Sequence, residues 1–272
     1  MDIKTKEPFG EAAVRLGYAN SGDIVRALEE QQSRQDEAQK APMIGLIMVE
    51  LGFLTSEQVA SVLHGSVSHR YRVSEDAFRL ATRLRANLEN SQQLLVFSGD
   101  SNRLDTGEIC AQVALAMALM QDGRVLYMDA CLQENGRPRR RPLTRRMFAL
   151  RQERGLYNLL AGECELNEVL ARNQGNGLDV LPAGKAAEGH VAQLLSERCR
   201  LQFDALRRDY RYIMVEIPRL LDRADAPILA SRSDGAILVA SVGRDRRSEL
   251  QQARQLLEGL NRPLLGVVLY RS

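Results

Sequence analysis

The most restrictive feature of this 272-residue sequence is the alternation of short apolar segments with amphipathic segments from residue 93 onward. The apolar segments are continuous, which is typical of parallel strands that are buried on both faces of a sheet. The segments between them have the four-residue apolar spacing of helices. The pattern therefore predicts an α/β fold, a parallel sheet flanked by helices. The predicted strands are 93–98, 124–129, 178–182, 212–217, 235–241 and 264–269, and the predicted helices are 107–121, 189–209, 224–231 and 246–258.

The beginning of the chain has a different pattern, a segment that occurs twice, over 8–31 and again over 43–66. In each copy, a glycine in third place is followed by an apolar pair, a second glycine and a segment with helical spacing. Each copy therefore predicts a helix, a glycine-terminated turn and a second helix. Because neither copy can bury its apolar face alone, we expect the two copies to pack together. The repeated glycines are Gly10, Gly17, Gly45 and Gly52.

These two patterns predict two domains, which the length of the chain accommodates. Residues 1–70 are expected to form a small, mainly helical domain, and residues 71–272 the α/β domain. A basic amphipathic segment over 73–88 predicts a helix that leads from the first domain into the second.

The composition excludes several classes of protein. With 44% hydrophobic residues, 26% charged residues and a net charge of +2, it is that of an ordinary soluble protein without strong charge bias. The first ten residues are charged and lack the apolar centre of a signal peptide. No run approaches the roughly 20 apolar residues of a membrane span. We expect a cytoplasmic protein, with peripheral attachment to the inner membrane as the alternative.

The cysteines and histidines give no indication of a metal site. The four cysteines are scattered without a close pair, and the three histidines do not cluster with them. Zinc sites and disulfide frameworks have characteristic close spacings that are absent here. We expect buried, unpaired thiols and no bound metal.

The loop after the first predicted strand has the position of a phosphate-binding P-loop, and a helix rich in small residues follows it. A P-loop needs glycines for close backbone approach, a lysine on the phosphates and a hydroxyl on magnesium. In the register that the helix sets, Thr106 occupies the lysine position and Asp105 a glycine position. Gly107 and Glu108 occupy the hydroxyl positions. Because the loop gains two carboxylates and loses a cation, we expect it not to bind ATP and Mg²⁺.

Two acidic residues end predicted strands at the edge where ligands bind in parallel sheets. Asp129 ends the strand 124–129, and Glu216 lies near the end of the strand 212–217. Such residues organise magnesium or act as a base, although Asp129 alone fits a strand-end cap equally well. Together they indicate descent from a metal–nucleotide enzyme, and we expect no catalytic residue in the present chain.

Six segments in order carry a resemblance to one family: DAFRLATRLRANL, VLYMDACL, RGLYNLLAGECELNEVL, LDVLPAG, the run from Val191 to Pro218, and LLGVVLY. They resemble the cytoplasmic kinase domain of bacterial tyrosine autokinases of the capsular-exopolysaccharide type, which is related to the MinD and ParA ATPases. The resemblance implies a P-loop NTPase-like fold and a partner in the cytoplasmic tail of a membrane polysaccharide chain-length or export protein.

The departures from that family fall at its functional positions. Thr106 replaces the P-loop lysine, Gly107 the hydroxyl residue, and Glu216 the aspartate of the Walker B motif. Tyr270 stands where the family has an adenine-contacting asparagine. The resemblance therefore indicates a pseudokinase with a degenerate Walker A motif.

The family's ring-assembly pattern, an acidic residue followed by two arginines, is kept only in part. Asp76 and Arg79 are in register, and Thr82 occupies the third position. Assembly of identical chains is therefore left open.

The repeated N-terminal segments resemble the N-terminal domain of type II secretion and pilus ATPases, some of which bind cyclic di-GMP. That motif begins with an arginine, which Pro8 and Met43 replace here. Two functions are open, a protein-docking module and a cyclic di-GMP sensor. The candidate nucleotide-binding residues are Gly10, Gly17, Gln31, Gly45 and Gly52.

An arginine-rich segment follows the second predicted strand, with two prolines that keep it extended. It can be a solvated loop, contact an anionic membrane surface, or bind an acidic protein partner. We expect no nucleic acid, because aromatic residues are only 5% of the chain and no recognition helix is evident. The arginines are Arg137, Arg139, Arg140, Arg141, Arg145 and Arg146.

Three hypotheses follow. The first is a non-catalytic scaffold or regulator of bacterial exopolysaccharide or capsule biosynthesis and export, derived from a tyrosine autokinase. The second is a cyclic di-GMP sensor that signals to a degenerate kinase domain. The third is a divergent ATP-binding kinase or ATPase that uses Asp129 and Glu216.

Overall fold

The computed structural model of the chain describes a set of ranges that together cover most of both predicted domains. The segment 100–104 of the predicted P-loop, the arginine-rich segment 137–146 and the predicted domain boundary near residue 70 lie outside them. The described residues are 8–37, 43–55, 58–59, 62, 73–89, 91, 93–99, 105–120, 123–132, 148, 150, 153–173, 177–185 and 189–271.

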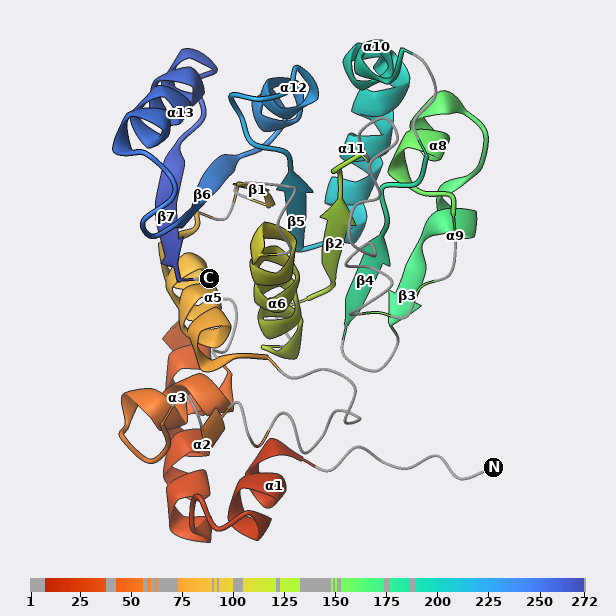
Figure 1. The fold of residues 1–272 in the computed structure, drawn as a ribbon. Helices are drawn as coiled ribbons and strands as arrows, with labels where there is room; N and C mark the ends of the chain where they lie inside the picture. Colours follow the sequence, from red (N-terminus) through yellow and green to blue (C-terminus); the bar gives the residue numbers. More distant parts are fainter. Residues whose placement is uncertain are drawn as a thin grey trace.

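Within these ranges, seven strands form one sheet in the order β3-β4-β2-β5-β1-β6-β7 (Figure 1). The six predicted strands are all present, and each pairs in parallel with its neighbours among them. The prediction of a parallel sheet is wrong only for β3, an unpredicted edge strand antiparallel to β4. Antiparallel strands need only a short connection, and β3 precedes β4 directly in the chain. The strands are β1 (Leu94–Ser98), β2 (Val125–Asp129), β3 (Ala171–Asn173), β4 (Leu178–Leu181), β5 (Tyr212–Ile217), β6 (Gly235–Ser241) and β7 (Leu264–Tyr270).

Helices cover both faces of the sheet, as the continuous apolar strands predict. On one face, α5 and α6 pack on alternate residues of the central strands, among them Phe97 and Tyr127. On the other face, α8, α10, α11, α12 and α13 pack on the intervening residues, among them Val96 and Met128 (Figure 1). The helices are α5 (Glu75–Asn87), α6 (Asp105–Leu119), α8 (Leu156–Ala161), α9 (Leu166–Val169), α10 (His190–Leu195), α11 (Glu197–Asp209), α12 (Asp225–Ser231) and α13 (Arg247–Gly259).

The predicted helix 189–209 is in fact two helices, α10 and α11, which meet at Ser196. The Ser196 backbone is extended, and its hydroxyl accepts a hydrogen bond from the Cys199 amide at 3.1 Å. A serine cap of this kind satisfies the first amides of a new helix. The apolar spacing continues across the break, so periodicity alone did not reveal it. The short helices α8 and α9 were not predicted either.

In the described part of the N-terminal repeat, three of the predicted helices are present, α1 (Phe9–Arg15), α2 (Ser21–Glu37) and α3 (Ile44–Glu50), and most of the second helix of the second copy lies outside the described residues. The turns after α1 and α3 are equivalent. The Gly17 amide donates to Val14 and the Gly52 amide to Val49, both at 3.0 Å. The two glycines have φ angles of +72° and +74°, a left-handed conformation that glycine adopts without strain. The second glycine of each copy is therefore a helix-terminating residue.

The first glycine of each copy lies at a helix contact. A β-carbon on Gly10 would lie 2.9 Å from Ile24 of α2, and one on Gly45 would lie 3.2 Å from Phe9 of α1. The two copies thus pack against each other, as expected. Their buried residues belong to the same apolar cluster as those of α5 and α6. The division into domains near residue 70 remains a prediction.

Candidate functional site

The candidate site lies at the carboxyl edge of the sheet, where β2 and β5 end beneath the start of α6. Asp129 and Glu216 are register partners on these adjacent parallel strands. Their side chains are only 2% and 1% exposed. The two strand ends therefore lie side by side, because parallel strands place their carboxyl ends at one edge of the sheet.

The Glu216 carboxylate fills the space beside the first turn of α6. A β-carbon built on Gly107 would lie 2.4 Å from Glu216 Oε2, well inside van der Waals contact. The Tyr127 hydroxyl, from the neighbouring strand β2, donates to the same Oε2 at 2.8 Å. Burial, together with the charges of Glu216 and Asp129, raises the pKa of the Tyr127 phenol well above its ordinary value. Tyr127 therefore stays protonated and holds the carboxylate in place.

Thr106, at the predicted lysine position, is also buried, with 1% of its surface exposed. It lies over the end of β1, where a β-carbon on Gly99 would meet its hydroxyl oxygen at 2.3 Å. The same β-carbon would lie 2.8 Å from the carbonyl oxygen of Val239 on β6. Only glycine fits at position 99, because the threonine side chain and the β6 backbone both approach it closely.

The acidic residues of the predicted loop begin α6. Asp105 is its first residue. Glu108 accepts a hydrogen bond of 3.3 Å from the amide group of Gln112, one turn further along the helix. The Gln112 side-chain oxygen in turn accepts from the backbone amide of Ser74 at 3.0 Å. Since Ser74 caps α5, this chain of hydrogen bonds joins α5 to the start of α6.

Cys131, which is not among the predicted site residues, lies beside the two carboxylates. One ligand atom from each of Asp129, Cys131 and Glu216 lies within 4.8 Å of the others, and all three residues are buried. The Cys131 amide donates to Asp129 Oδ1 at 2.9 Å, which turns the chain back toward the strand end. The only sequence clue was the spacing of Asp129 and Cys131, two residues apart at a predicted strand end.

A second thiol lies close to the same charges from the helix side. Cys110 of α6 is fully buried. Burial, reinforced by the charges of Glu216 and Asp129, raises the pKa of the Cys110 thiol well above its ordinary value. Cys110 is therefore a neutral thiol beneath the site.

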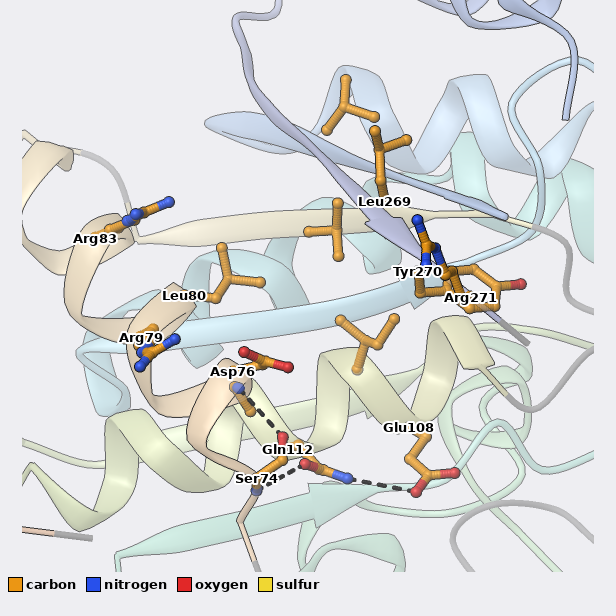
Figure 2. Close-up of a pocket in the computed structure, with 14 residues that line it drawn as sticks. Ser74, Asp76, Arg79, Leu80, Arg83, Glu108, Gln112, Leu269, Tyr270 and Arg271 are labelled. Atoms are coloured by element: carbon orange, nitrogen blue, oxygen red, sulfur yellow. Dashed lines mark hydrogen bonds between the residues drawn. The ribbon is translucent and has the colours of Figure 1, made fainter. Parts of the chain in front are cut away.

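A groove of about 760 Å³ lies next to the site, between α5, the start of α6 and the end of β7. Figure 2 shows Asp76 and Arg79 of α5 on one side of it and Tyr270 on the other. The structure thus brings together the residues of the predicted ring-assembly pattern and the residue at the predicted adenine position. Thr82, the third residue of that pattern, instead donates its hydroxyl to the Phe78 carbonyl at 2.9 Å.

The family that the sequence resembles implies ATP and Mg²⁺ at this edge, and the described residues do not fit them. A magnesium-binding hydroxyl at position 107 has no space while Glu216 occupies its present position. The residue at the lysine position is a buried threonine. Lys185, a basic residue in the segment after β4, forms an ion pair of 2.5 Å with Glu153, in the segment before α8. Arg103 lies outside the described residues.

The structure describes one of the two other predicted surfaces, the candidate cyclic di-GMP residues, and does not describe the arginine-rich one. Among the candidate cyclic di-GMP residues, the four glycines have the structural roles given above, and Gln31 is half-buried on α2. The predicted partner or membrane surface, from Arg137 to Arg146, lies outside the described residues. None of the helices in the described ranges combines the length and apolar composition needed to cross a bilayer.

The fold is that of P-loop NTPases, a mostly parallel sheet between two layers of helices. A structure of cobyrinic acid a,c-diamide synthase from Mycobacterium smegmatis, with an ATP analogue and magnesium bound, has a TM-score of 0.50 at 18% identity. The match covers 65% of this chain and 74% of that one. No known protein-family profile matches the sequence.

The homologues of this chain are bacterial tyrosine-protein kinases. CpsD of Streptococcus agalactiae is 25% identical over 209 residues, which cover 74% of this chain and 89% of CpsD. The kinase etk of Escherichia coli K12 is 28% identical over 185 residues, or 68% of this chain and 24% of etk. The solved kinase domain of Escherichia coli ETK has a TM-score of 0.59 at 26% identity and covers 72% of this chain and 74% of that domain.

Proposed function

We propose that this chain is a non-catalytic scaffold or regulator of bacterial exopolysaccharide or capsule synthesis and export, derived from a tyrosine kinase. The observation that carries the proposal is the contact between Gly107 and Glu216. Glu216 is one methylene longer than aspartate, and its carboxylate fills the place of a side chain at position 107. The two substitutions are complementary in volume, because the longer acid at position 216 occupies the space that a hydroxyl side chain at position 107 would need.

Calorimetric titration of the purified chain with ATP and Mg²⁺ tests this proposal. We expect no binding at micromolar nucleotide, with CpsD as a positive control, and no incorporation of labelled phosphate into tyrosine. Micromolar binding would overturn the proposal and favour the divergent-enzyme hypothesis. In that case, loss of magnesium-dependent turnover in Asp129→Ala would establish Asp129 as part of the active site.

The proposed partner is the cytoplasmic tail of a membrane polysaccharide chain-length or export protein, which would place the chain at the inner membrane. Support comes from the kinase homologues and from exposed apolar side chains on the N-terminal module. Val25 and Leu28 lie one turn apart on α2 and are 53% and 47% exposed. We assign the module a protein-docking function, because its repeated glycines are explained by turns and helix packing.

A pull-down from solubilised membranes tests the partner. We expect a polysaccharide-assembly protein to be recovered with the full chain and to be lost with Val25→Asn. The matched control is Leu201→Asn, because Leu201 on α11 is equally exposed, at 53%. Recovery that is unaffected by Val25→Asn would contradict docking through α2.

A separate titration with cyclic di-GMP distinguishes the docking module from a sensor. We expect no heat of binding, because Pro8 and Met43 stand where the resembling motif has arginines that can stack on guanine. Micromolar binding that Gln31→Ala weakens would instead support a sensor.

A further inference from the structure

The donor set at the carboxyl edge of the sheet differs chemically from a magnesium site. Asp129 and Glu216 contribute carboxylates, and Cys131 contributes a thiol, all from buried residues. Magnesium takes oxygen ligands in near-octahedral geometry and keeps several waters. A sulfur and two carboxylate oxygens are instead ligands that zinc and cobalt accept together.

The pairing of β2 with β5 and the turn after β2 place these three side chains. Asp129 and Glu216 are fixed opposite each other by the β2–β5 register. Cys131 follows two residues after Asp129, and its amide hydrogen bond to Asp129 Oδ1 closes the turn. Its thiol lies over the end of β5, 3.8 Å from the Glu216 carbonyl oxygen. The Cys131 side chain therefore lies on the same side of the sheet edge as both carboxylates.

The separations are close to those of a metal site. Zinc binds sulfur at about 2.3 Å and carboxylate oxygen at about 2.1 Å, so ligand atoms on one tetrahedral ion lie about 3.4–3.6 Å apart. The three donor atoms already lie within 4.8 Å of one another. Small side-chain rotations of about 1 Å are enough to bring them to a common ion.

We propose that Asp129, Cys131 and Glu216 bind a divalent cation of the zinc class, which would occupy the edge of the sheet in place of magnesium and nucleotide. On binding, the Cys131 thiol releases its proton to solvent as the sulfur–metal bond forms, so the affinity rises with pH. The three protein ligands leave a fourth coordination position for a water molecule. The proposal does not depend on the chain being a pseudokinase.

Cobalt(II) titration of the tag-free, full-length chain tests the site, because cobalt substitutes for zinc and is coloured. We expect one equivalent to bind, with the visible bands of a tetrahedral site and an ultraviolet sulfur-to-cobalt charge-transfer band. Zinc is expected to displace the cobalt and abolish both, whereas magnesium in large excess should not. Absence of saturable cobalt binding would overturn the proposal.

Cysteine variants assign the sulfur ligand. In Cys131→Ser we expect the charge-transfer band to vanish, whereas Cys164→Ser, in the turn between α8 and α9, should leave it unchanged. Loss of the band in Cys110→Ser, but not in Cys131→Ser, would overturn the assignment. Substitution of residues that only hydrogen-bond to metal ligands weakens metal affinity by about 10–100-fold. Removal of the sulfur ligand itself should therefore weaken cobalt binding at least as much.

Carboxylate variants keep the test decisive if Cys131→Ser fails to fold, which circular dichroism would reveal. We expect Asp129→Asn and Glu216→Gln each to weaken cobalt binding at least about 10-fold. This lower bound is the effect of substituting residues that only hydrogen-bond to metal ligands. Unchanged affinity in both would overturn the site. The ATP titration remains a separate measurement, so failure of the metal site and failure of the proposed pseudokinase are distinguishable.

Discussion

At the scale of single residues, the structure joins two of the substitutions, Gly107 and Glu216, in one contact and places the third, Thr106, against Gly99. Sequence alignment to a P-loop places Thr106, Gly107 and Glu216 at positions that normally hold lysine, a hydroxyl and aspartate. In the fold, Glu216 lies against Gly107 and Thr106 lies against Gly99. The longer acid is accommodated because the helix residue above it has no side chain.

This contact predicts a strong coupling between positions 107 and 216. Gly107→Ser should destabilise the fold by about 1–3 kcal/mol, the range for overpacking a buried site. In the Glu216→Asp background the same change should cost at least about 1 kcal/mol less, because the shorter acid withdraws from the new side chain. Urea unfolding of the wild type, the two single variants and the double variant measures this coupling as a double-mutant cycle. Gly259→Ser, in α13 with no atom within 4 Å of its would-be β-carbon, is the helical control. Additive effects would contradict the contact.

A second residue-scale prediction concerns acid stability. Burial raises the pKa of Asp234, but hydrogen bonds from Arg207 and from the Gln93 and Leu94 amides outweigh it, so its pKa lies below the ordinary value. Because this pKa is lower in the folded than in the unfolded protein, the ionised carboxyl stabilises the fold. The stabilisation is complete above the pKa of the unfolded protein, about 3.9, and is lost as the pH falls through the pKa of the folded protein. The stability difference between wild type and Asp234→Asn should therefore be constant above pH ~5 and shrink below pH ~4. Urea midpoints from pH 3 to 7 measure it, and a pH-independent difference would contradict the assignment.

At the scale of elements, the repeated N-terminal segment is the clearest case in which local sequence determines local structure. Both copies use the same sequence of helix, left-handed glycine and turn, with equivalent hydrogen bonds. The contact between α2 and α3 is reinforced by an ion pair of 2.5 Å between Arg34 and Glu50. Such an exposed pair contributes little by itself, so apolar packing is the main source of stability for the module.

Gly17→Ala and Gly52→Ala should therefore have nearly equal effects. A β-carbon at either position meets no atom within 4 Å, so the cost is conformational and amounts to about 1 kcal/mol. Gly266→Ala, on β7 with equally open space and no positive φ, should cost less. Thermal unfolding of the three variants gives the comparison. A much larger effect in one repeat than in the other would show that the two turns are not equivalent.

At the scale of the whole molecule, a single apolar cluster links the N-terminal module to α5, α6 and the sheet. It contains Ala13 and Met48 of the module, Phe78 of α5 and Tyr127 of β2. A shared core makes separate unfolding of the module costly, because part of the common apolar cluster would be exposed to water.

We therefore predict one cooperative unfolding transition for the full chain, although the sequence patterns indicate two domains. Differential scanning calorimetry should give a calorimetric enthalpy equal to the van't Hoff enthalpy. Two resolved transitions, the first of them shifted by Gly17→Ala alone, would show that the module unfolds independently.

The sequence by itself determined the α/β class, the positions of six strands along the chain, and the helix-and-turn pattern that both N-terminal copies show in the described residues. Continuous apolar runs and helical spacing are local properties, and β5 and β6, which are buried from end to end, have the predicted bounds. It also located Asp129 and Glu216 at one sheet edge, since the connectivity of parallel strands requires it.

Only the tertiary structure decided how the site is filled. The contact of Gly107 with Glu216, the approach of Cys131 to both carboxylates and the groove beside Tyr270 join residues far apart in the chain. The antiparallel strand β3 forms by pairing with β4, and the break at Ser196 depends on one capping hydrogen bond, neither of which periodicity reports. These contacts depend on the volumes and hydrogen-bonding groups of side chains that different elements bring together. The spacing of residues along the chain does not report which side chains will meet in this way.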